Sequence, residues 1–253
     1  MNFERKNKIL EMLRANGVVM LKDLRKLFPD VSEMTLRRDL EYFEKSGEAV
    51  RIKGGARCSS FDESKLEEVF TKRLVQNAAA KEKIARIALQ YVETGRSMFV
   101  DSGSTMLAFT KGLPDKKLNI ITNGPHIAVE AAKIPGVNIT LVGGMFNRDS
   151  QSVSGAQSTE FIKNIKFDIA FMSASAVSDQ GCTQGNLSEC ELKNHIMRQA
   201  KQRIILADSS KFGKTMPFCF ATFSDIDIIV TDKRPDDGFL FNTNIYGIKV
   251  IWD

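Results

Sequence analysis

The sequence predicts an α/β fold in two parts, a small helical domain that ends in a β-hairpin and a larger domain built on a mostly parallel sheet. Residues 1–57 carry apolar side chains at helical spacing and finish with an alternating basic segment and two glycines. Later in the chain, short apolar runs alternate with helical segments, which is typical of a parallel sheet covered on both faces. A polar stretch separates the two patterns. We therefore expect domains at 1–57 and 77–253, joined by a linker and connecting helix at 58–76.

Two helices and a short strand open the small domain. Residues 4–16 place Ile9 and Leu13 one helical turn apart, and a glycine ends this segment. Residues 18–20 form an apolar strand that could pair with the later hairpin. A second helix is expected over residues 21–28, before a Pro-Asp turn.

The third helix is the most informative segment of the chain. Ser32 is a good N-cap, because its hydroxyl can accept a hydrogen bond from a backbone N–H of the first turn. Leu36, Leu40 and Phe43 follow at i, i+4 and i+7 and give the helix one apolar face, and Gly47 ends it. The other face carries an adjacent pair of arginines. A helix with an apolar back and a guanidinium-bearing front can lie in a DNA major groove.

A basic hairpin follows this helix. Residues 50–53 alternate apolar and basic side chains, as a half-buried strand would, and Gly54-Gly55 turns the chain back. Helices, turn and basic hairpin in this order predict a winged helix-turn-helix that binds double-stranded operator DNA. The predicted DNA-binding residues are Ser32, Met34, Thr35, Arg37, Arg38, Arg51 and Lys53.

The distribution of charge favours DNA binding over the alternative, an ordinary helical subdomain with a solvated basic face. The chain has a net charge of +5. Residues 1–57 hold 13 Lys and Arg against nine Asp and Glu, whereas the remaining residues hold 23 against 22. The positive excess therefore lies in the part that would neutralise DNA phosphates. The asymmetry is modest and supports the prediction without establishing it.

Composition excludes several classes of function. No apolar run approaches membrane-spanning length and no secretory signal is evident, so we expect a cytoplasmic protein without a membrane partner. The four cysteines show no CxxC pair and there are only two histidines, so we expect reduced thiols, no zinc site and no cofactor. The cysteines are Cys58, Cys182, Cys190 and Cys219.

The larger domain shows alternating strand and helix patterns. An amphipathic helix is expected over 79–92. Strands are expected at 97–100, 119–122, 137–142, 167–172, 203–207, 227–231 and 248–252. Helices are expected at 104–111, 125–133, 157–164 and 188–200.

Four polar or glycine-rich clusters follow expected strands, at 101–105, 122–124, 143–144 and 208–213. Ligands of parallel α/β sheets bind beyond the carboxyl ends of the strands. Any one cluster is explained equally well by the small residues and N-caps that a strand-to-helix turn requires. Together, their hydroxyls, amide, lysine and free helix-start N–H groups favour a small anionic ligand such as a phosphorylated sugar.

One further polar segment has two open explanations. Residues 179–183, followed by Glu189, Glu191 and Lys193, could form a rim or lid over a ligand. A solvated loop and a charged helix face explain the same residues equally well.

Taken in order, the motifs resemble the DeoR family of bacterial transcriptional regulators over nearly the whole chain. VSEMTLRRDL and the GGA after the wing resemble that family's DNA-binding signature, and DSGST, TNG, LVGG, FDIAFMSASAV, DQGCT and DSSKFGK follow in the family's order. The resemblance implies a sensor domain related to sugar-phosphate isomerases, operator binding as a homo-oligomer (dimer or tetramer), and release by a phosphorylated sugar. The residues that match expected effector positions are Asp101, Gly103, Ser104, Thr105, Asn123, Gly143, Gly144, Gly181 and Lys211.

Two features depart from the family pattern. Gly103-Ser104-Thr105 stands where the family usually has Gly-Thr-Thr, which keeps both hydroxyls. The turn over residues 28–32 is one residue longer than typical, which could tilt the recognition helix.

The sequence therefore predicts a repressor of a carbohydrate-catabolism operon, with no catalytic residues. The alternative is a sugar-phosphate isomerase-like enzyme fused to a DNA-binding module. Such an enzyme needs a carboxylate base, for which Asp179 and Glu189 are candidates that no spacing distinguishes. A third hypothesis is a DNA-binding protein whose pocket has lost its ligand.

Overall fold

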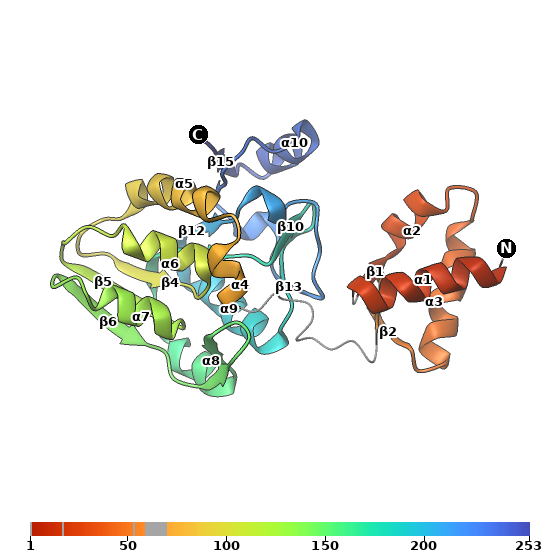
Figure 1. Cartoon of the computed structure of the whole chain (residues 1–253), viewed down its shortest axis with the longest axis horizontal. Helices are drawn as coiled ribbons and strands as arrows, with labels where there is room; N and C mark the ends of the chain where they lie inside the picture. The colour runs from red at the N-terminus through yellow and green to blue at the C-terminus, as the bar shows by residue number, and fades with distance from the viewer. Residues whose placement is uncertain (1, 17, 53, 59–69) are drawn as a thin grey trace. The chain divides into compact units, whose positions relative to one another are not determined.

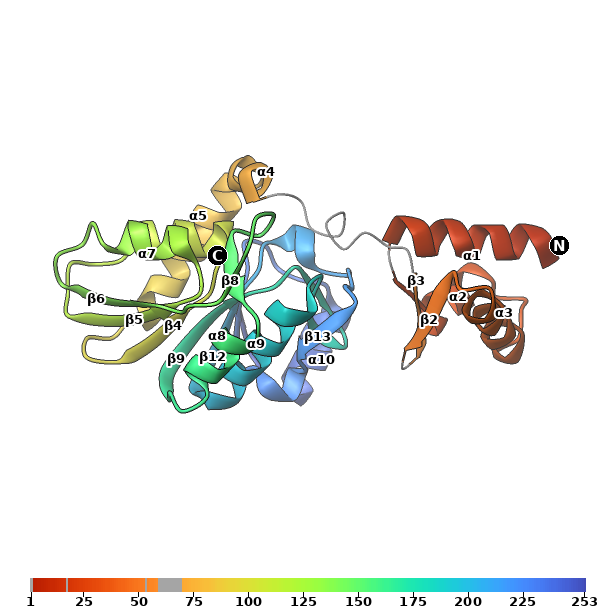
Figure 2. The same cartoon turned by 90° about the horizontal axis from the view of Figure 1, so that it is seen from below.

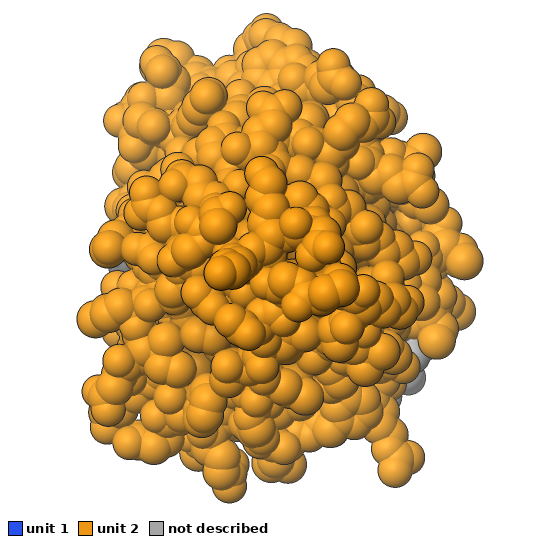
Figure 3. Space-filling view, turned by 90° about the vertical axis from the view of Figure 1, so that its left-hand side faces the viewer, with its two compact units in different colours: residues 1–66 blue, residues 67–253 orange. Residues whose placement is uncertain are grey.

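The computed structural model describes residues 2–16, 18–52, 54–58 and 70–253 of the chain (Figure 1). Contacts between residues divide the chain into unit 1, Met1–Leu66, and unit 2, Glu67–Asp253, which Figure 3 colours separately. Lys53 and most of the expected linker lie outside the described residues. Within the described ranges, no helix is both long enough and apolar enough to cross a bilayer.

Unit 1 is a winged helix-turn-helix, as predicted. Its elements are α1 (Asn2–Asn16), β1 (Val18–Met20), α2 (Leu21–Leu27), α3 (Glu33–Lys45), β2 (Ala49–Ile52) and β3 (Gly55–Cys58). The strands form an antiparallel sheet in the order β1-β3-β2, so the strand before α2 does pair with the hairpin. Ile9, Leu13, Leu36, Leu40 and Phe43 are among the side chains of a single buried core beneath the three helices.

Local interactions define both ends of α3 and attach it to α1. The backbone N–H of Thr35 donates to the Ser32 hydroxyl at 3.3 Å, which is the predicted N-cap. Gly47 adopts φ +76° after the last turn, a conformation that favours glycine. The guanidinium of Arg5 donates to the buried carboxylate of Asp39 through Nε at 2.6 Å and Nη2 at 3.3 Å, which fixes α1 against α3.

Unit 2 is built on a seven-stranded parallel sheet, as predicted. The strand order is β15-β14-β12-β9-β4-β5-β6, and every pairing is parallel. These strands are β4 (Ser97–Val100), β5 (Leu118–Thr122), β6 (Val137–Leu141), β9 (Phe167–Ser173), β12 (Ala200–Leu206), β14 (Ile228–Val230) and β15 (Lys249–Ile251).

Helices cover both faces of this sheet (Figure 2). On one side lie α5 (Ala78–Ala88), α6 (Ser104–Lys111) and α7 (Pro125–Ala131), and on the other lie α8 (Ala156–Ile162), α9 (Leu187–Gln199) and α10 (Asp237–Ile245). Alternate residues of β4 enter the two cores, because Met98 and Val100 pack on one face and Phe99 on the other. Strand β4 is therefore buried on both sides, whereas the edge strand β6 has no fully buried residue.

Several short elements were not predicted. They are the hairpin β7 (Met145–Asn147) and β8 (Ser152–Ser154), the antiparallel sheet of β10 (Ala176–Ser178), β11 (Gly181–Gln184) and β13 (Phe218–Ala221), helix α10, and the 3-10 turns η2 (Leu89–Tyr91), η3 (Ser209–Lys211) and η4 (Phe223–Asp225). The expected helix over 79–92 ends as an α-helix at Ala88 and continues as η2, and the described part of the connecting helix is α4 (Phe70–Val75). Strands of three or four residues are too short to show a clear alternation in sequence.

The strand order reverses between β4 and β9. From β4 the chain builds outward through β5 to β6, and it then returns to β9 on the other side of β4. The segments that leave the carboxyl ends of β4 and β9 therefore run in opposite directions. In open α/β sheets this switch point is where a binding crevice forms.

Candidate DNA-binding surface and effector pocket

The outward face of α3 is exposed and carries two of the three arginines predicted to bind DNA, Arg37 and Arg38. Met34 is 63% exposed, and Arg37 and Arg38 are exposed beside it. Thr35 is half-buried, and its hydroxyl lies 2.9 Å from that of Ser32. This arrangement leaves a basic helix surface free to enter a groove.

The two arginines differ in their partners. Arg37 donates to Glu33 at 2.8 Å through Nη2, and this hydrogen bond and charge hold the pKa of the Glu33 carboxyl below its usual value. Arg38 has no hydrogen-bond or ion-pair partner among the residues that the structure describes. Arg37 is therefore partly neutralised within the protein, whereas the full charge of Arg38 is available to a base or phosphate.

The surface next to α3 adds basic residues that the sequence analysis missed. Lys22, Arg25 and Lys26 of α2 line a hollow with the Pro29–Ser32 turn, and Arg25 lies 3.2 Å from Glu33. The sequence could have revealed these three residues, because they lie among the buried leucines of the helix that precedes the recognition helix. In the hairpin, Arg51 lies 3.5 Å from Glu41, and Lys53 is outside the described residues.

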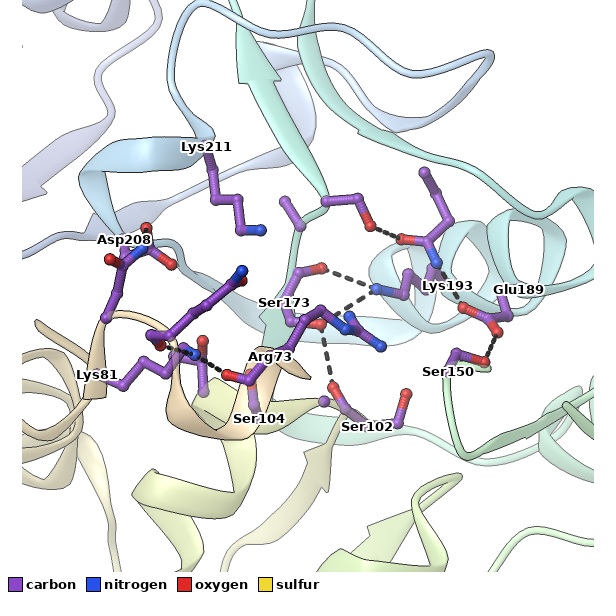
Figure 4. A pocket seen from close by; sticks show the side chains of 17 residues that line it. Arg73, Lys81, Ser102, Ser104, Ser150, Ser173, Glu189, Lys193, Asp208 and Lys211 are labelled. Carbon is purple, nitrogen blue, oxygen red and sulfur yellow. Dashed lines mark hydrogen bonds between the residues drawn. The ribbon is translucent and has the colours of Figure 1, made fainter. Parts of the chain in front are cut away.

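The candidate effector site is a polar pocket at the carboxyl ends of β4 and β9 (Figure 4). Of the predicted effector residues, Gly103, Ser104, Thr105 and Lys211 line it. The lining residues that were not among the predicted site residues include Arg73, Asn77, Lys81, Ser150, Ser173, Gln184, Glu189, Lys193 and Asp208. The pocket thus forms at the switch point.

The amino terminus of α6 opens into this pocket. Gly103 occupies the N-cap with φ +111°, and because it has no side chain it leaves the first turn without a side-chain cap. Ser104 and Thr105 occupy that first turn. An uncapped helix start presents backbone N–H groups and a partial positive charge, which suit an anion.

A buried ion pair lies under the pocket. Lys193 Nζ is 2.8 Å from Asp101 Oδ2, and the two side chains are 3% and 0% exposed. The same Oδ2 accepts hydrogen bonds from the backbone N–H of Ser173 at 2.9 Å and its hydroxyl at 2.7 Å. Lys193 also donates to the carbonyl oxygen of Ser173 at 2.8 Å. Asp101 therefore ties the ends of β4, β9 and α9 together instead of facing a ligand directly.

A second buried carboxylate, Glu189, lies one helical turn before Lys193 on α9. Its Oε1 accepts hydrogen bonds from the hydroxyls of Ser150 and of Ser152, the latter at 2.7 Å, and its Oε2 accepts from the Gln184 amide. Both α9 residues are buried, so the solvated helix face that was one explanation of this segment is wrong for them. Glu191, between them, is exposed.

The other predicted effector residues lie outside this pocket. Asn123 is buried and donates to the carbonyl oxygen of Val153 at 3.3 Å. Gly143 and Gly144 line a different hollow with Met145, Gln157 and Phe161. A Cβ on Gly181 would lie 2.1 Å from the carbonyl oxygen of Ala221, so this glycine permits close contact between β11 and β13. Asp179, one candidate base, is exposed and does not line the pocket.

The electrostatic balance of the pocket is positive. Among the described lining residues, four side chains are cationic, Arg73, Lys81, Lys193 and Lys211, and two are carboxylates, Glu189 and Asp208. In the described part of the chain, no group of three or more His, Cys, Asp or Glu side chains is placed to hold a metal ion. Cationic side chains beside a helix start suit a phosphate.

Comparison with known proteins agrees with this architecture. Residues 5–61 match the model of the DeoR-like helix-turn-helix domain, and residues 76–233 match that of the DeoR C terminal sensor domain. The transcriptional regulator GolR of Listeria innocua is 33% identical over 92% of this chain and 91% of its own length. A putative aga operon transcriptional repressor of Escherichia coli O157:H7 is 31% identical over 98% and 93%.

Among solved structures, ribose 5-phosphate isomerase A of Methanocaldococcus jannaschii is similar to 54% of this chain and 55% of its own, with a TM-score of 0.40 and 18% identity. The two sequence relatives above instead cover more than 90% of both chains, as does the regulator IolR of Bacillus subtilis, 31% identical over 95% of each chain. With both of its domains matched in order, this chain belongs to the DeoR family of DNA-binding transcriptional regulators.

Proposed function

We propose that this regulator is a repressor of a carbohydrate-catabolism operon and that a phosphorylated sugar bound at the β4–β9 pocket releases it from its operator. The observation that carries the proposal is the meeting of an uncapped helix start with cationic side chains at the switch point of the sheet. The description of the matching domain as a sensor supports a ligand. Two relatives are named as repressors, which supports repression.

The phosphate would lie at the α6 end of the pocket. Backbone N–H groups at Ser104 and Thr105 would donate to its oxygens, and Lys211 reaches the same space from η3 (Figure 4). A helix start and an ammonium group both stabilise a dianion, and neither requires a metal ion. This end of the pocket therefore selects for the phosphoryl group.

The opposite end would recognise hydroxyl groups. Glu189 and Gln184 offer a carboxylate and an amide, and Ser150 and Ser175 offer hydroxyls that also line the pocket. Ser175 already donates to the Gln184 amide oxygen at 3.0 Å, so these groups form a connected polar surface. A ligand with several hydroxyls can exchange hydrogen bonds with such a surface.

On the DNA side, the exposed face of α3 would enter the major groove and the basic residues of α2 and the hairpin would contact phosphates. Two copies of the chain would read a two-fold symmetric operator, so we propose a homodimer or a tetramer built from dimers.

A thermal-shift screen tests the ligand part of the proposal. We expect ribose, fructose or glucose phosphates to raise the melting temperature, and the unphosphorylated sugars to leave it unchanged. Lys211→Ala should lose at least half of the shift. Lys214→Ala is the matched control, because Lys214 is an exposed lysine three residues away that does not line the pocket. Equal shifts in both variants would contradict the phosphate site.

Incubation of the same sugar phosphates with purified protein tests the isomerase alternative. Glu189 is the only candidate base of the two proposed that lines the pocket, and its carboxylate is already engaged by Ser150, Ser152 and Gln184. We expect no turnover. Interconversion of a sugar phosphate that Glu189→Gln abolishes would instead support the enzyme.

A further inference from the structure

Helix α4 is the first described element of unit 2, and it forms one wall of the pocket. It spans Phe70–Val75 and directly follows residues 59–69, the segment that leads from unit 1 in the sequence. Arg73 from α4, and Gln76 and Asn77 just after it, line the pocket. The part of unit 2 that lies nearest to unit 1 in the sequence is therefore also part of the effector site.

A buried ring and a backbone hydrogen bond hold the amino-terminal end of α4. Phe70 is 3% exposed, and its ring stacks on that of His126 with centroids 5.0 Å apart and planes 5° apart. The backbone N–H of Phe70 donates to the carbonyl oxygen of Asp149 at 2.8 Å. Asp149 precedes Ser150, which lines the pocket, so this attachment is continuous with the site.

Pocket residues hold the carboxyl-terminal end of α4. The buried ammonium of Lys81 donates to the carbonyl oxygens of Arg73 and Gln76. Asn77 has φ +52°, and its amide donates to Asp208 Oδ1 at 3.1 Å. Lys81, Asn77 and Asp208 all line the pocket, so any ligand that engages them also acts on the end of α4.

After Phe70, the apolar side chains of the helix are exposed. Val75 is 78% exposed and Leu74 is 38% exposed. A helix of six residues is too short to be stable by itself, so its position depends on the groups that hold its two ends. A change at either end is therefore expected to alter the stability of the whole element.

We propose that α4 is the element that couples pocket occupancy to DNA release, with Arg73 as its phosphate-binding residue. The inference deepens the proposed function and rests on it. A phosphate in the pocket adds an ionic contact to Arg73, whose side chain extends into the pocket in Figure 4. It also attracts Lys81, which otherwise caps the α4 carbonyls. The bound and free states thus differ in how firmly α4 is held, and that difference supplies a coupling free energy.

Hydrogen exchange on the wild-type chain tests the coupling without any substitution. Ribose 5-phosphate, fructose 6-phosphate and inorganic phosphate serve as probes, and the thermal shift identifies which of them bind. We expect a bound sugar phosphate to change the exchange rate of the 70–77 amides at least threefold, while α10 is unaffected. Binding that leaves the 70–77 amides unchanged overturns this inference alone. If no probe binds, the proposed function itself fails.

Substitutions at two apolar residues of α4 provide the second test. Phe70→Ala removes the buried attachment, and Val75→Ala is the matched control on the same helix. We expect Phe70→Ala to bind the sugar phosphate more weakly, because it loosens the helix that carries Arg73, and at a saturating ligand concentration to lose most of the ligand-induced weakening of operator binding. Val75→Ala should keep both properties. Full release of DNA by Phe70→Ala would overturn the inference. If that variant does not fold, the exchange measurement on the wild type decides.

Discussion

The ammonium of Lys193 lies 2.8 Å from the carboxylate of Asp101, and both side chains are buried where β4 and α9 meet at the switch point of the sheet. The pair also binds Ser173 at the end of β9, so one charged cluster connects three elements that surround the pocket. Burying two charges is costly unless they are well paired and hydrogen-bonded. The geometry satisfies this condition for Lys193 Nζ and Asp101 Oδ2, whereas Asp101 Oδ1 is buried without a hydrogen-bond partner among the described residues. The cluster positions the floor of the pocket.

Removing one member of this pair should be strongly destabilising. Lys193→Met leaves Asp101 as an uncompensated buried charge, and we expect a loss of about 3–5 kcal/mol in the free energy of unfolding. The double variant Asp101→Asn with Lys193→Met should be more stable than Lys193→Met alone, because it removes the unpaired charge. Chemical denaturation measures all three free energies.

Lys201→Met is the matched control for the buried pair. Lys201 lies 2.8 Å from Asp168, the same separation, but its side chain is 73% exposed. An exposed pair contributes at most about 1 kcal/mol, so this variant should remain close to wild type. A similar loss in Lys193→Met and Lys201→Met would show that burial of the first pair has no energetic consequence.

On the DNA surface, the unpaired arginine of α3 should determine sequence preference. Arg38→Ala is expected to weaken operator binding by about 1–3 kcal/mol and to remove the preference for operator over unrelated DNA. Arg86→Ala removes the same charge from an exposed position on α5 of unit 2 and serves as the control. Gel-shift titrations with an operator selected from random duplexes measure both. Unchanged specificity in Arg38→Ala would refute the placement of α3 in the groove.

Substitutions at two glycines of the predicted effector set should have different effects on stability. Gly181 has φ +111° and its Cβ would meet the Ala221 carbonyl, so Gly181→Ala should lose about 2 kcal/mol or more in stability. A Cβ added at Gly143 would meet no atom within 4 Å, so Gly143→Ala should change the free energy of unfolding by less than about 0.5 kcal/mol. Thermal unfolding compares the two variants, and equal stability of both would contradict the steric argument.

Much of the fold was predictable because local signals agreed with the tertiary structure. Ser32, Leu36, Leu40 and Phe43 gave the recognition helix its cap and its buried face, and both are present as expected. Inner parallel strands such as β4 and β9 were predictable since burial on both faces makes them nearly continuous apolar runs. Helix α10 was missed because no apolar stripe at helical spacing marks its sequence.

The pocket was predictable only where it is built from strand ends. Gly103, Ser104 and Lys211 follow strands and were expected to line it. Glu189 and Lys193 reach it from a helix that packs back across the sheet, which depends on tertiary structure. The sequence analysis named both residues but left open whether they face a ligand or solvent. One signal could have decided this, since both lie on the buried face of α9 with Leu192 and Ile196. A charged side chain on the buried face of a helix requires hydrogen-bond or ionic partners, and Glu189 and Lys193 each have several.

The thiols should respond to pH and to labelling reagents according to their burial. Burial raises the pKa of the Cys190 thiol to about 11 and also raises that of the fully buried Cys182. The pKa of Cys219 is also raised by desolvation, so at pH 8 accessibility sets the order of labelling. Iodoacetamide should label the exposed Cys219 first and reach Cys182 and Cys190 only after unfolding. Mass spectrometry of the labelled peptides measures the order.

The same pKa shift predicts a loss of stability in alkaline solution. An unfolded Cys190 thiol loses its proton near its ordinary pKa of 9.0, whereas the folded thiol keeps its proton to about 11. The unfolded state then binds fewer protons, so the free energy of unfolding should fall as pH rises between those values. Cys190→Ala should show a shallower decline, and an identical pH profile would contradict the shift.

The central claim is that occupancy of the β4–β9 pocket and operator binding are thermodynamically linked. The most direct test is the dissociation constant of the operator complex, measured by fluorescence anisotropy with and without a saturating sugar phosphate. We predict that the ligand weakens operator binding at least tenfold, and that operator DNA weakens ligand binding by the same factor, because linkage is reciprocal. The same operator affinity with and without a sugar phosphate that demonstrably binds would contradict the account.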